Sequence, residues 1–328
     1  MTGYDMINDI LASARPFAIP LRNRFRGTDI REGLLIDGPA GWAEFAPFAD
    51  YDDAACVPWL RAAVDTAIRN WPTALRPQIE VNTTVPVVSP DAAREMVAAS
   101  GCRTAKVKVA GPSTSAHDDV LRVEAVREAL GDGGRIRVDA NGAWDVDTAV
   151  TRIGELSSAA GGLEYVEQPC TTVDELIAVR ARVEVPIAAD ESIRLATDPL
   201  EVARRGAADI AVIKVGPLAG VWHALQIAEE CGLPVVVSSA VDTSVGLAAG
   251  LALAGALPQL PYACGLGTAS LLTGDVVERP LTPTQGLLPV VPYSPEPDAE
   301  LLARHAMPAQ REQYWRERIA RVAALAFG

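Results

Sequence analysis

Charged side chains recur at one kind of position in the middle of the chain, where a short Val- and Ile-rich run gives way to a polar turn. In chain order they are Lys106, Lys108, Asp139, Glu167, Asp190 and Lys214. Apolar runs of this length are typical of parallel strands that are buried on both faces. The carboxyl ends of such strands meet at one face of a barrel, so we expect these side chains to converge on a single site.

Three of these side chains are carboxylates, which would repel one another if they met without a cation. Burial would add a desolvation cost of several kcal/mol for each. A divalent cation removes both costs, and an all-oxygen ligand set favours Mg²⁺ over zinc. The chain has three histidines, and none lies at a predicted strand end. We therefore predict that Asp139, Glu167 and Asp190 bind Mg²⁺, with Mn²⁺ as a substitute.

The lysines indicate acid–base chemistry. Lys106 and Lys108 share one face of a predicted strand, because side chains alternate along a strand. Two ammonium groups this close disfavour each other's charge, which lowers a lysine pKa toward the range of a general base. Lys214 follows the sixth strand, on the opposite side of the ring. A metal flanked by two lysines suits removal of a proton α to a carboxylate.

Each of these residues also has a purely structural interpretation. The Lys106–Lys108 pair is compatible with a solvated strand end, Asp139 with a turn, and Asp190 with a helix cap. Glu167 could be a loop carboxylate with satisfied hydrogen bonds. The catalytic interpretation is favoured because Lys, Asp, Glu, Asp and Lys follow one another at five successive strand ends.

The spacing of these residues predicts the fold. Neighbouring strand ends lie between 23 residues (Glu167 to Asp190) and 31 residues (Lys108 to Asp139) apart, which suits one strand, one helix and two loops. Eight such runs predict the α/β class, as a modified (β/α)7β barrel of the TIM type over residues 86–274. A doubly wound sheet is the competing architecture, but no G-x-G-x-x-G turn follows any predicted strand.

The regions on either side differ from the barrel. Residues 1–85 predict a small α+β domain, with two strands joined by a Gly-Pro turn over residues 31–45 and an Ala-rich helix near residues 53–70. After residue 275 the chain is rich in proline and ends in a predicted helix over residues 298–326. The segment 275–328 either packs on the first domain or stays loosely attached.

Composition excludes several classes of protein. With 328 residues, 49% of them hydrophobic and 22% charged, the chain is too apolar to be disordered. Its net charge of −13 makes nucleic acid and anionic membrane surfaces poor partners. The longest apolar run, Val245–Leu257, is too short to span a bilayer and predicts a buried helix. Five widely spaced cysteines and an acidic N-terminus without a signal peptide predict a cytoplasmic protein, which we expect to be a monomer.

The strand-end motifs resemble those of the enolase superfamily, in its muconate-lactonizing subgroup. The matching segments are 106-KVK, 139-DAN, 167-EQP, 190-DES and Lys214. The resemblance spans nearly the whole chain and implies an N-terminal α+β capping domain ahead of the barrel. It also implies that the three acidic residues bind Mg²⁺, that Lys108 is the base, and that Lys214 is its partner across the site.

Within the superfamily, further segments resemble the o-succinylbenzoate synthase family of actinobacteria. They are 20-PLRNRFRG, 40-AGWAEFAPF, 135-RIRVDANG, 165-YVEQP, 236-VVSSA and 262-YACGLGT. This implies dehydration of a small dicarboxylate, 2-succinyl-6-hydroxy-2,4-cyclohexadiene-1-carboxylate, to 2-succinylbenzoate, a step in menaquinone synthesis. Lys108 would take the α-proton and return it to the departing hydroxyl on the same face, while Lys214 stays protonated.

Other polar residues complete the predicted site. We expect substrate binding from Lys106 and from a basic loop over residues 22–26, whose Arg24 and Arg26 could close over the succinyl tail as a lid. Three residues at the last two strand ends are expected to hydrogen-bond substrate oxygens: Ser238, Ser239 and Gly265. Support for the metal and the lysines is expected from Arg137, Asn141 and Glu191.

Alternatives to this reaction remain open. An N-acylamino acid racemase, or another enzyme of the same subgroup, would use both lysines, one on each face of its substrate. A dipeptide epimerase is disfavoured because 263-ACGLG lacks an acidic D-x-D pair, and a mandelate-type enzyme because 235-VVVSS lacks a histidine. A non-catalytic barrel that only binds a metabolite is the remaining alternative.

Overall fold

The computed structural model describes residues 3–112 and 114–328. An antiparallel sheet begins the chain: α1 (Gly3–Ala12) leads into β1 (Arg15–Phe25), β2 (Thr28–Gly38) and β3 (Gly41–Phe45), which pair in that order. Buried Phe17 and Ile19 alternate with more exposed residues along β1, as in a sheet with one face on a core. Helix α2 (Asp53–Ile68) follows, so the two strands and the helix expected in this region are confirmed.

The basic segment at residues 22–26, expected as a loop, is mostly strand. It forms the end of β1, and the turn Arg26-Gly27, with positive φ at both residues, joins β1 to β2. Alternation along the strand buries Phe25 and leaves Arg22 and Arg24 exposed on the other face. The segment is therefore the tip of a hairpin, and its basic side chains do not share one direction.

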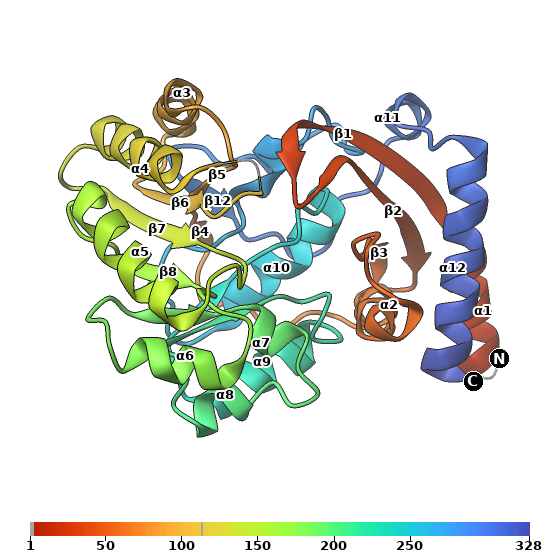
Figure 1. Cartoon of the computed structure of the whole chain (residues 1–328). Helices are drawn as coiled ribbons and strands as arrows, with labels where there is room; N and C mark the ends of the chain where they lie inside the picture. Colours follow the sequence, from red (N-terminus) through yellow and green to blue (C-terminus); the bar gives the residue numbers. More distant parts are fainter. Residues whose placement is uncertain (1–2, 113) are drawn as a thin grey trace.

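Seven parallel strands form the second part of the molecule, and their order in the sheet follows the chain without a crossover. They are β5 (Thr83–Val85), β6 (Thr104–Lys108), β7 (Arg135–Asp139), β8 (Tyr165–Glu167), β9 (Ile187–Ala189), β10 (Ile210–Ile213) and β11 (Val235–Val237). Buried Val, Ile and Ala dominate them, because helices cover the outer face of the sheet (Figure 1).

The run near residue 263, expected as the eighth strand, is only a pair of isolated bridges. Cys264 pairs with Val81 next to β5, and Gly265 pairs with Ser238 next to β11. The backbone N–H of Gly265 donates to Val237 O at 2.8 Å, and that of Cys264 donates to Glu80 O at 2.7 Å. This short segment therefore joins the two edges of the seven-stranded sheet and completes the ring.

The helices between the strands begin at the caps that the sequence suggests. Ser89 caps the helix that starts at Pro90, and Thr172 with Glu175 forms a capping box. The helix bounds are α3 (Pro90–Ser100), α4 (Ala116–Leu130), α5 (Val146–Ala160), α6 (Val173–Arg180), α7 (Glu191–Arg194), α8 (Glu201–Arg204), α9 (Val221–Cys231) and α10 (Ser244–Ala256). The predicted buried helix is confirmed as α10. Among the described residues, no helix combines the length and apolarity needed to cross a membrane.

The C-terminal region returns to the N-terminal sheet. After the 3-10 helix Gly267–Leu271, strand β12 (Leu287–Pro289) pairs with β4 (Gln78–Glu80). The single helix expected over residues 298–326 is two, α11 (Ala299–Arg304) and α12 (Ala309–Phe327), because Pro308 cannot continue a helix that precedes it.

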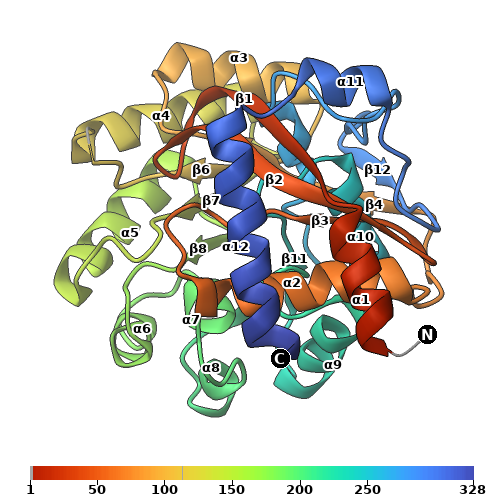
Figure 2. The same ribbon diagram turned by 90° about the vertical axis from the view of Figure 1, so that its right-hand side faces the viewer.

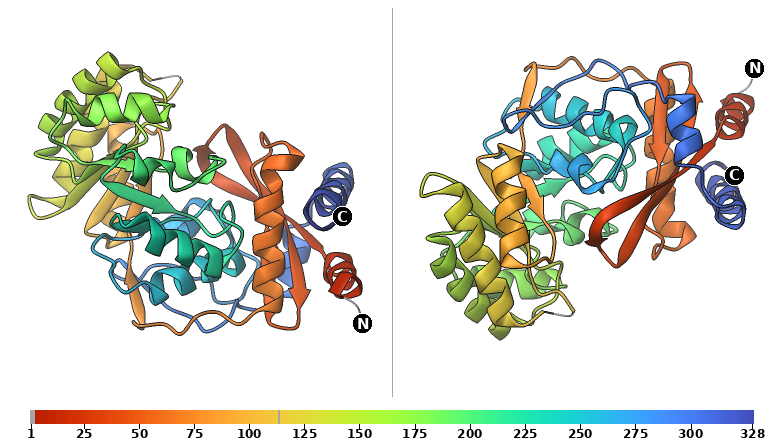
Figure 3. Two further views of the ribbon diagram at one scale, coloured as in Figure 1. Left: turned by 90° about the horizontal axis from the view of Figure 1, so that it is seen from below. Right: turned by 90° about the horizontal axis from the view of Figure 1, so that it is seen from above.

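Helix α12 lies on the outer side of the N-terminal sheet, beside α1 (Figure 2). Its Trp315 is buried against Phe45 of β3, and Arg61 of α2 donates to Ala326 O at 3.1 Å. Figure 3 shows the sheet and α2 standing between this outer layer and the barrel. The N-terminal sheet, α2 and the returning α12 thus form one packed unit beside the mouth of the barrel.

Candidate active site

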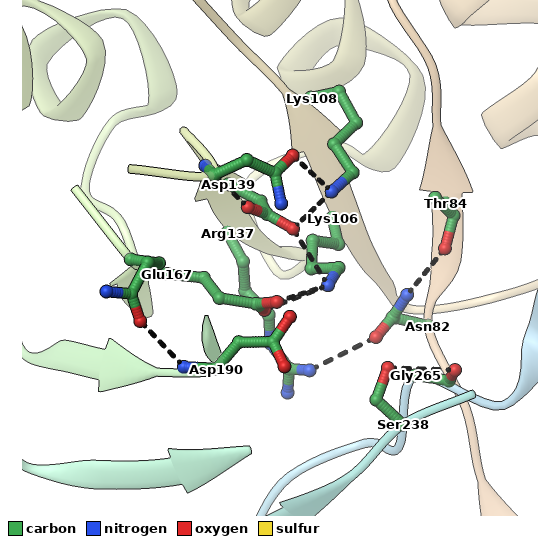
Figure 4. A network of polar contacts seen from close by, with 12 residues as sticks. Asn82, Thr84, Lys106, Lys108, Arg137, Asp139, Glu167, Asp190, Ser238 and Gly265 are labelled. Atoms are coloured by element: carbon green, nitrogen blue, oxygen red, sulfur yellow. Dashed lines mark hydrogen bonds and ion pairs between the residues drawn. The ribbon is translucent and has the colours of Figure 1, made fainter. Parts of the chain in front are cut away.

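The three predicted carboxylates lie at the carboxyl ends of adjacent strands. Asp139 ends β7 and Glu167 ends β8, and the two residues are paired in register. Asp190 directly follows β9. All three are at most 2% exposed. Figure 4 shows their side chains pointing into one region, with the Lys106 ammonium among them.

Two lysines approach these carboxylates from β6. Lys106 Nζ lies 2.8 Å from both Glu167 carboxylate oxygens and 3.2 Å from Asp139 Oδ2. Lys108 Nζ lies 2.5 Å from the same Asp139 oxygen, and the ring of Phe25 is 5.3 Å away. The expected common face of the two lysines is confirmed, since both reach the carboxylates of the neighbouring strands.

Lys214 enters from the other side of the ring. It follows β10, and its Nζ lies 2.5 Å from Asp190 Oδ2. With the bridging segment 264–265 counted as the eighth member, three members separate β6 from β10 in either direction. Lys108 and Lys214 therefore face one pocket, which both line, from opposite sides.

The charges at the site are strongly coupled. Burial and the neighbouring Asp139 carboxylate raise the pKa of Glu167 above its usual range. Burial also opposes ionisation of Asp139, but the ammonium groups of Lys108 and Lys106 outweigh it and hold the pKa of that carboxyl far below its usual range. The neighbouring ammonium groups thus hold Asp139 in its charged form, whereas burial and a like charge make Glu167 easier to protonate.

The expected effect of paired lysines on pKa is wrong for Lys106. Burial would lower its pKa, but Glu167 and Asp139 outweigh burial and raise it well above the usual value. The lysine with a lowered pKa is Lys214, where burial is the largest cause and the nearby Arg194 adds to it. Burial and contacts with carboxylates therefore decide these pKa shifts more than the spacing of the lysines does.

The donor chemistry fits a divalent cation. Among residues 3–112 and 114–328, no group of three or more His, Cys, Asp or Glu side chains is arranged to hold a metal ion as it stands. The reason is visible in the contacts, because the Lys106 ammonium takes oxygens of both Asp139 and Glu167. The positively charged Lys106 ammonium thus already lies between the carboxylates of Asp139 and Glu167. Hard oxygen donors of this kind suit Mg²⁺ or Mn²⁺.

Asn141 and Glu191 lie beside the lysines and carboxylates. Asn141 accepts from Lys108 Nζ at 2.8 Å and donates to Glu191 Oε1 at 3.1 Å. Asn141 and Gln168 both have positive φ, near 45°, at the turn after a strand. Gln168 uses its side-chain oxygen to accept from Asp190 N at 3.0 Å and Ser192 N at 3.2 Å, which fixes the backbone at Asp190.

Arg137 lies one layer below the carboxylates, inside the barrel. It is fully buried, stacks 4.6 Å from the Tyr165 ring centre and donates to Ala263 O at 2.7 Å. It also contacts Glu164 and Asn82. None of these contacts, all within the described residues, reaches Asp139, Glu167 or Asp190, so Arg137 fills the barrel beneath the site.

Some of the remaining predicted residues line the pocket, and others do not. Arg26 lines it, with its guanidinium 4.5 Å above the Phe48 ring, as do Ser238 and Ser239. Arg24 is instead exposed and bonded to Asp29 at 3.3 Å. Gly265 packs directly under Ser238, whose hydroxyl donates to Gly265 O at 3.3 Å.

Sequence reasoning missed Arg194 and Tyr51. Arg194 is buried, lines the pocket and lies 3.1 Å from Asp190 Oδ1 through its Nε. It also contacts the hydroxyl of Tyr51, which comes from the loop between β3 and α2. The one available signal was spacing, since Arg194 follows Asp190 by four residues and shares its face of a helical turn.

Comparisons with known proteins agree with this architecture. Residues 89–296 match the family described as enolase C-terminal domain-like, and residues 17–67 match the enolase N-terminal domain-like family. The chain is 62% identical over 278 residues to the o-succinylbenzoate synthase of Thermobifida fusca, covering 85% of this chain and 87% of that protein. It is 52% identical over 324 residues to that of Mycolicibacterium smegmatis, covering 98% and 99%.

Solved structures share the fold. The L-Ala-D/L-Glu epimerase from Bacillus subtilis superposes with a TM-score of 0.74 at 24% identity, covering 86% of this chain and 96% of that chain. A muconate lactonizing enzyme from Pseudomonas fluorescens gives 0.76 at 19% identity, covering 89% and 97%. The predicted fold class, an α/β barrel beside an α+β capping domain, is confirmed.

The contact at Gly265 generates a prediction. A Cβ at this position would lie 2.5 Å from Ser238 Oγ and 3.1 Å from its Cβ. We expect Gly265→Ala to lower the free energy of unfolding by about 1–3 kcal/mol, because the Ser238 hydroxyl must rotate off Gly265 O and the Ser238 Cβ must give way slightly. Chemical denaturation measures the change. Gly133→Ala, whose Cβ would meet nothing within 4 Å, is the control.

A second substitution separates this contact from a general intolerance of Ala. Adding Ser238→Gly removes the clashing atoms and should restore part of the lost stability. A Gly265→Ala protein as stable as the Gly133→Ala control would contradict the expected clash.

Proposed function

The chain belongs to the o-succinylbenzoate synthase family of the enolase superfamily, and we propose that the pocket at the mouth of its barrel performs that reaction. The enzyme is a hydro-lyase that forms 2-succinylbenzoate. Its proposed substrate is 2-succinyl-6-hydroxy-2,4-cyclohexadiene-1-carboxylate, which loses water in a syn elimination. The observation that carries the proposal is the placement of Lys108 and Lys214 on opposite sides of three buried carboxylates.

Asp139, Glu167 and Asp190 would hold Mg²⁺, with Mn²⁺ as a substitute. When bound, the ion neutralises the substrate carboxylate and offsets the negative charge that develops as the α-proton leaves. The family membership and the all-oxygen donor set support this assignment. Lys106 now contacts Asp139 and Glu167, so it would release them and turn its ammonium toward the substrate carboxylate.

Lys108 moves the proton in this proposal. It takes the α-proton on its own side of the ring, which leaves the substrate as an ene-diolate. The protonated Lys108 then gives that proton to the departing hydroxyl. One water leaves, and Lys108 is again the neutral base. Asn141 accepts from Lys108 Nζ and would keep it oriented through both steps.

Lys214 stabilises charge from the opposite side. Its pairing with Asp190 at 2.5 Å supports a protonated side chain, although burial lowers its pKa. A fixed positive charge here stabilises the anionic intermediate without taking part in proton transfer. Formation of an aromatic ring drives the elimination, so positioning and charge stabilisation are sufficient.

The succinyl tail needs partners of its own. Arg26, at the tip of the β1–β2 hairpin, is the cation that the N-terminal sheet presents to the pocket. Ser238 and Ser239 would hydrogen-bond substrate oxygens, and the tight packing of Gly265 would set the position of Ser238. Arg24 points to solvent and belongs to the proposed site only if the hairpin moves.

The wider setting is also proposed from these observations. Residues 1–85 with 275–328 would form the capping unit, supported by the packing of α12 on α2, and residues 86–274 the catalytic barrel. A monomer acting on a small dicarboxylate within menaquinone synthesis, in the cytoplasm, agrees with the acidic surface and the five free thiols.

Racemisation of an N-acylamino acid is the second candidate. The observation that favours it is the same opposed placement of Lys108 and Lys214, since inversion needs a proton donor and acceptor on opposite faces. Inversion with solvent deuterium incorporated at the α-carbon, and without loss of water, would establish this activity.

A direct assay tests the proposed function. Purified protein with Mg²⁺ and the cyclohexadiene substrate should remove the diene absorbance, and EDTA should stop the reaction. Lys108→Ala should lower kcat at least about a hundredfold, because the proton has no other acceptor on that side. Retained Mg²⁺ binding by calorimetry controls for folding. A folded Lys108→Ala protein with unchanged turnover would exclude Lys108 as the base.

The two arginines of the hairpin provide a matched pair. Arg26→Gln should raise KM about tenfold or more, because a charged hydrogen bond to the succinyl carboxylate is lost. Arg24→Gln should change KM less than about twofold, since its exposed ion pair with Asp29 is worth little. Steady-state kinetics distinguish the two, and equal effects on KM would contradict the assignment of Arg26.

A further inference from the structure

A continuous chain of hydrogen bonds connects the two opposed lysines along one side of the pocket. From Lys108 it runs through Asn141 to Glu191. Arg194 then donates to Glu191 Oε1 at 2.5 Å and to Asp190 Oδ1 at 3.1 Å, and Lys214 closes the chain on Asp190 Oδ2 at 2.5 Å. Arg194 is the link that connects the Lys108 half to the Lys214 half.

Arg194 also determines which partner each carboxylate oxygen of Asp190 contacts. Its Nε takes Oδ1, which leaves Oδ2 directed at Lys214. Arg194 is 6% exposed, and its guanidinium uses nitrogens on three sides, toward Asp190, Glu191 and Tyr51. Lysine could supply the charge but not three donors in a fixed plane.

Tyr51 ties this arrangement to the N-terminal unit. Its hydroxyl accepts from Arg194, and the guanidinium carbon lies 5.9 Å from its ring centre. The Tyr51 ring is itself held edge-on by Phe48 at 5.9 Å and by Trp59 of α2 at 6.2 Å, and both of those residues line the pocket. Among the described residues, the members of the hydrogen-bond chain between the lysines all belong to the barrel. Tyr51 is attached to this chain from outside the barrel, through Arg194.

We propose that Arg194 is a positioning residue for Asp190 and Lys214, and that Tyr51 holds it in place from the capping unit. This inference rests on the proposed function, because it assigns Asp190 to the metal and Lys214 to the intermediate. Tyr51, from the loop between β3 and α2, fixes the Arg194 guanidinium. The guanidinium then fixes the Asp190 carboxylate, and this carboxylate orients Lys214. Docking of the capping unit and assembly of the catalytic groups are thereby coupled.

A double-substitution cycle tests the coupling, with Tyr51→Phe and Arg194→Lys as the single variants. Partners that orient a metal ligand typically change metal affinity or activity at least tenfold. Each single variant should therefore raise the Kd for Mg²⁺ by calorimetry about tenfold and lower kcat by a similar factor. The double variant should be no worse than Arg194→Lys, since Tyr51 acts through Arg194. KM should change less than kcat does.

Two substitutions outside the site serve as controls. Arg205→Lys alters a surface ion-pairing arginine directly after α8, and Tyr293→Phe alters an exposed tyrosine. Both should leave kcat and the Kd for Mg²⁺ unchanged. A general effect of Arg→Lys or Tyr→Phe replacement would appear in these proteins as well.

The outcomes are distinguishable. Independent, multiplicative effects of Tyr51→Phe and Arg194→Lys, with an active parent enzyme, would overturn the proposed coupling alone. A parent enzyme that forms no 2-succinylbenzoate would overturn the proposed function instead. If Arg194→Lys fails to fold, Tyr51→Phe still decides, because it removes one oxygen from a partly exposed side chain. Unchanged kcat and Mg²⁺ affinity in that variant would overturn the proposal.

Discussion

Three like charges that must be buried together are the constraint on which the rest of the site depends. Asp139 and Glu167 end β7 and β8, and Asp190 directly follows β9. The parallel register of these adjacent strands therefore holds the three side chains close together. Cations offset their mutual repulsion and desolvation. Lys106 contacts Asp139 and Glu167, Lys108 contacts Asp139, and Lys214 and Arg194 contact Asp190.

The capping unit and the barrel share the work of building the pocket. The barrel provides the carboxylates and lysines from rigid strand ends, where backbone hydrogen bonds to neighbouring strands fix their positions. The capping unit provides Arg26, Phe48 and Tyr51 from turns and loops, and Tyr51 links it to Arg194 of the barrel. Both parts of the chain therefore line the pocket, the barrel with Ser238 and Ser239 and the capping unit with Arg26 and Phe48.

Much of this arrangement could be predicted from the sequence because strand-end spacing repeats with the barrel. The charged residues at Lys106, Asp139, Glu167, Asp190 and Lys214 meet as that period requires. What failed depended on contacts that no period encodes. The basic residues of segment 22–26 suggested a loop, but the segment is the tip of a hairpin. The predicted eighth strand is only a pair of isolated bridges at Cys264 and Gly265. Arg194 was missed because its partner Tyr51 lies 143 residues earlier, and its spacing from Asp190 alone does not reveal that contact.

The central claim is that the buried carboxylates form one cation site from which Lys106 withdraws. A crystal structure with Mn²⁺, located by anomalous scattering, tests it most directly. The account predicts one ion bound by oxygens of Asp139, Glu167 and Asp190, with the Lys106 ammonium no longer in contact with Glu167. An ion bound elsewhere, or Lys106 still paired with both Asp139 and Glu167 at saturating Mn²⁺, would contradict it.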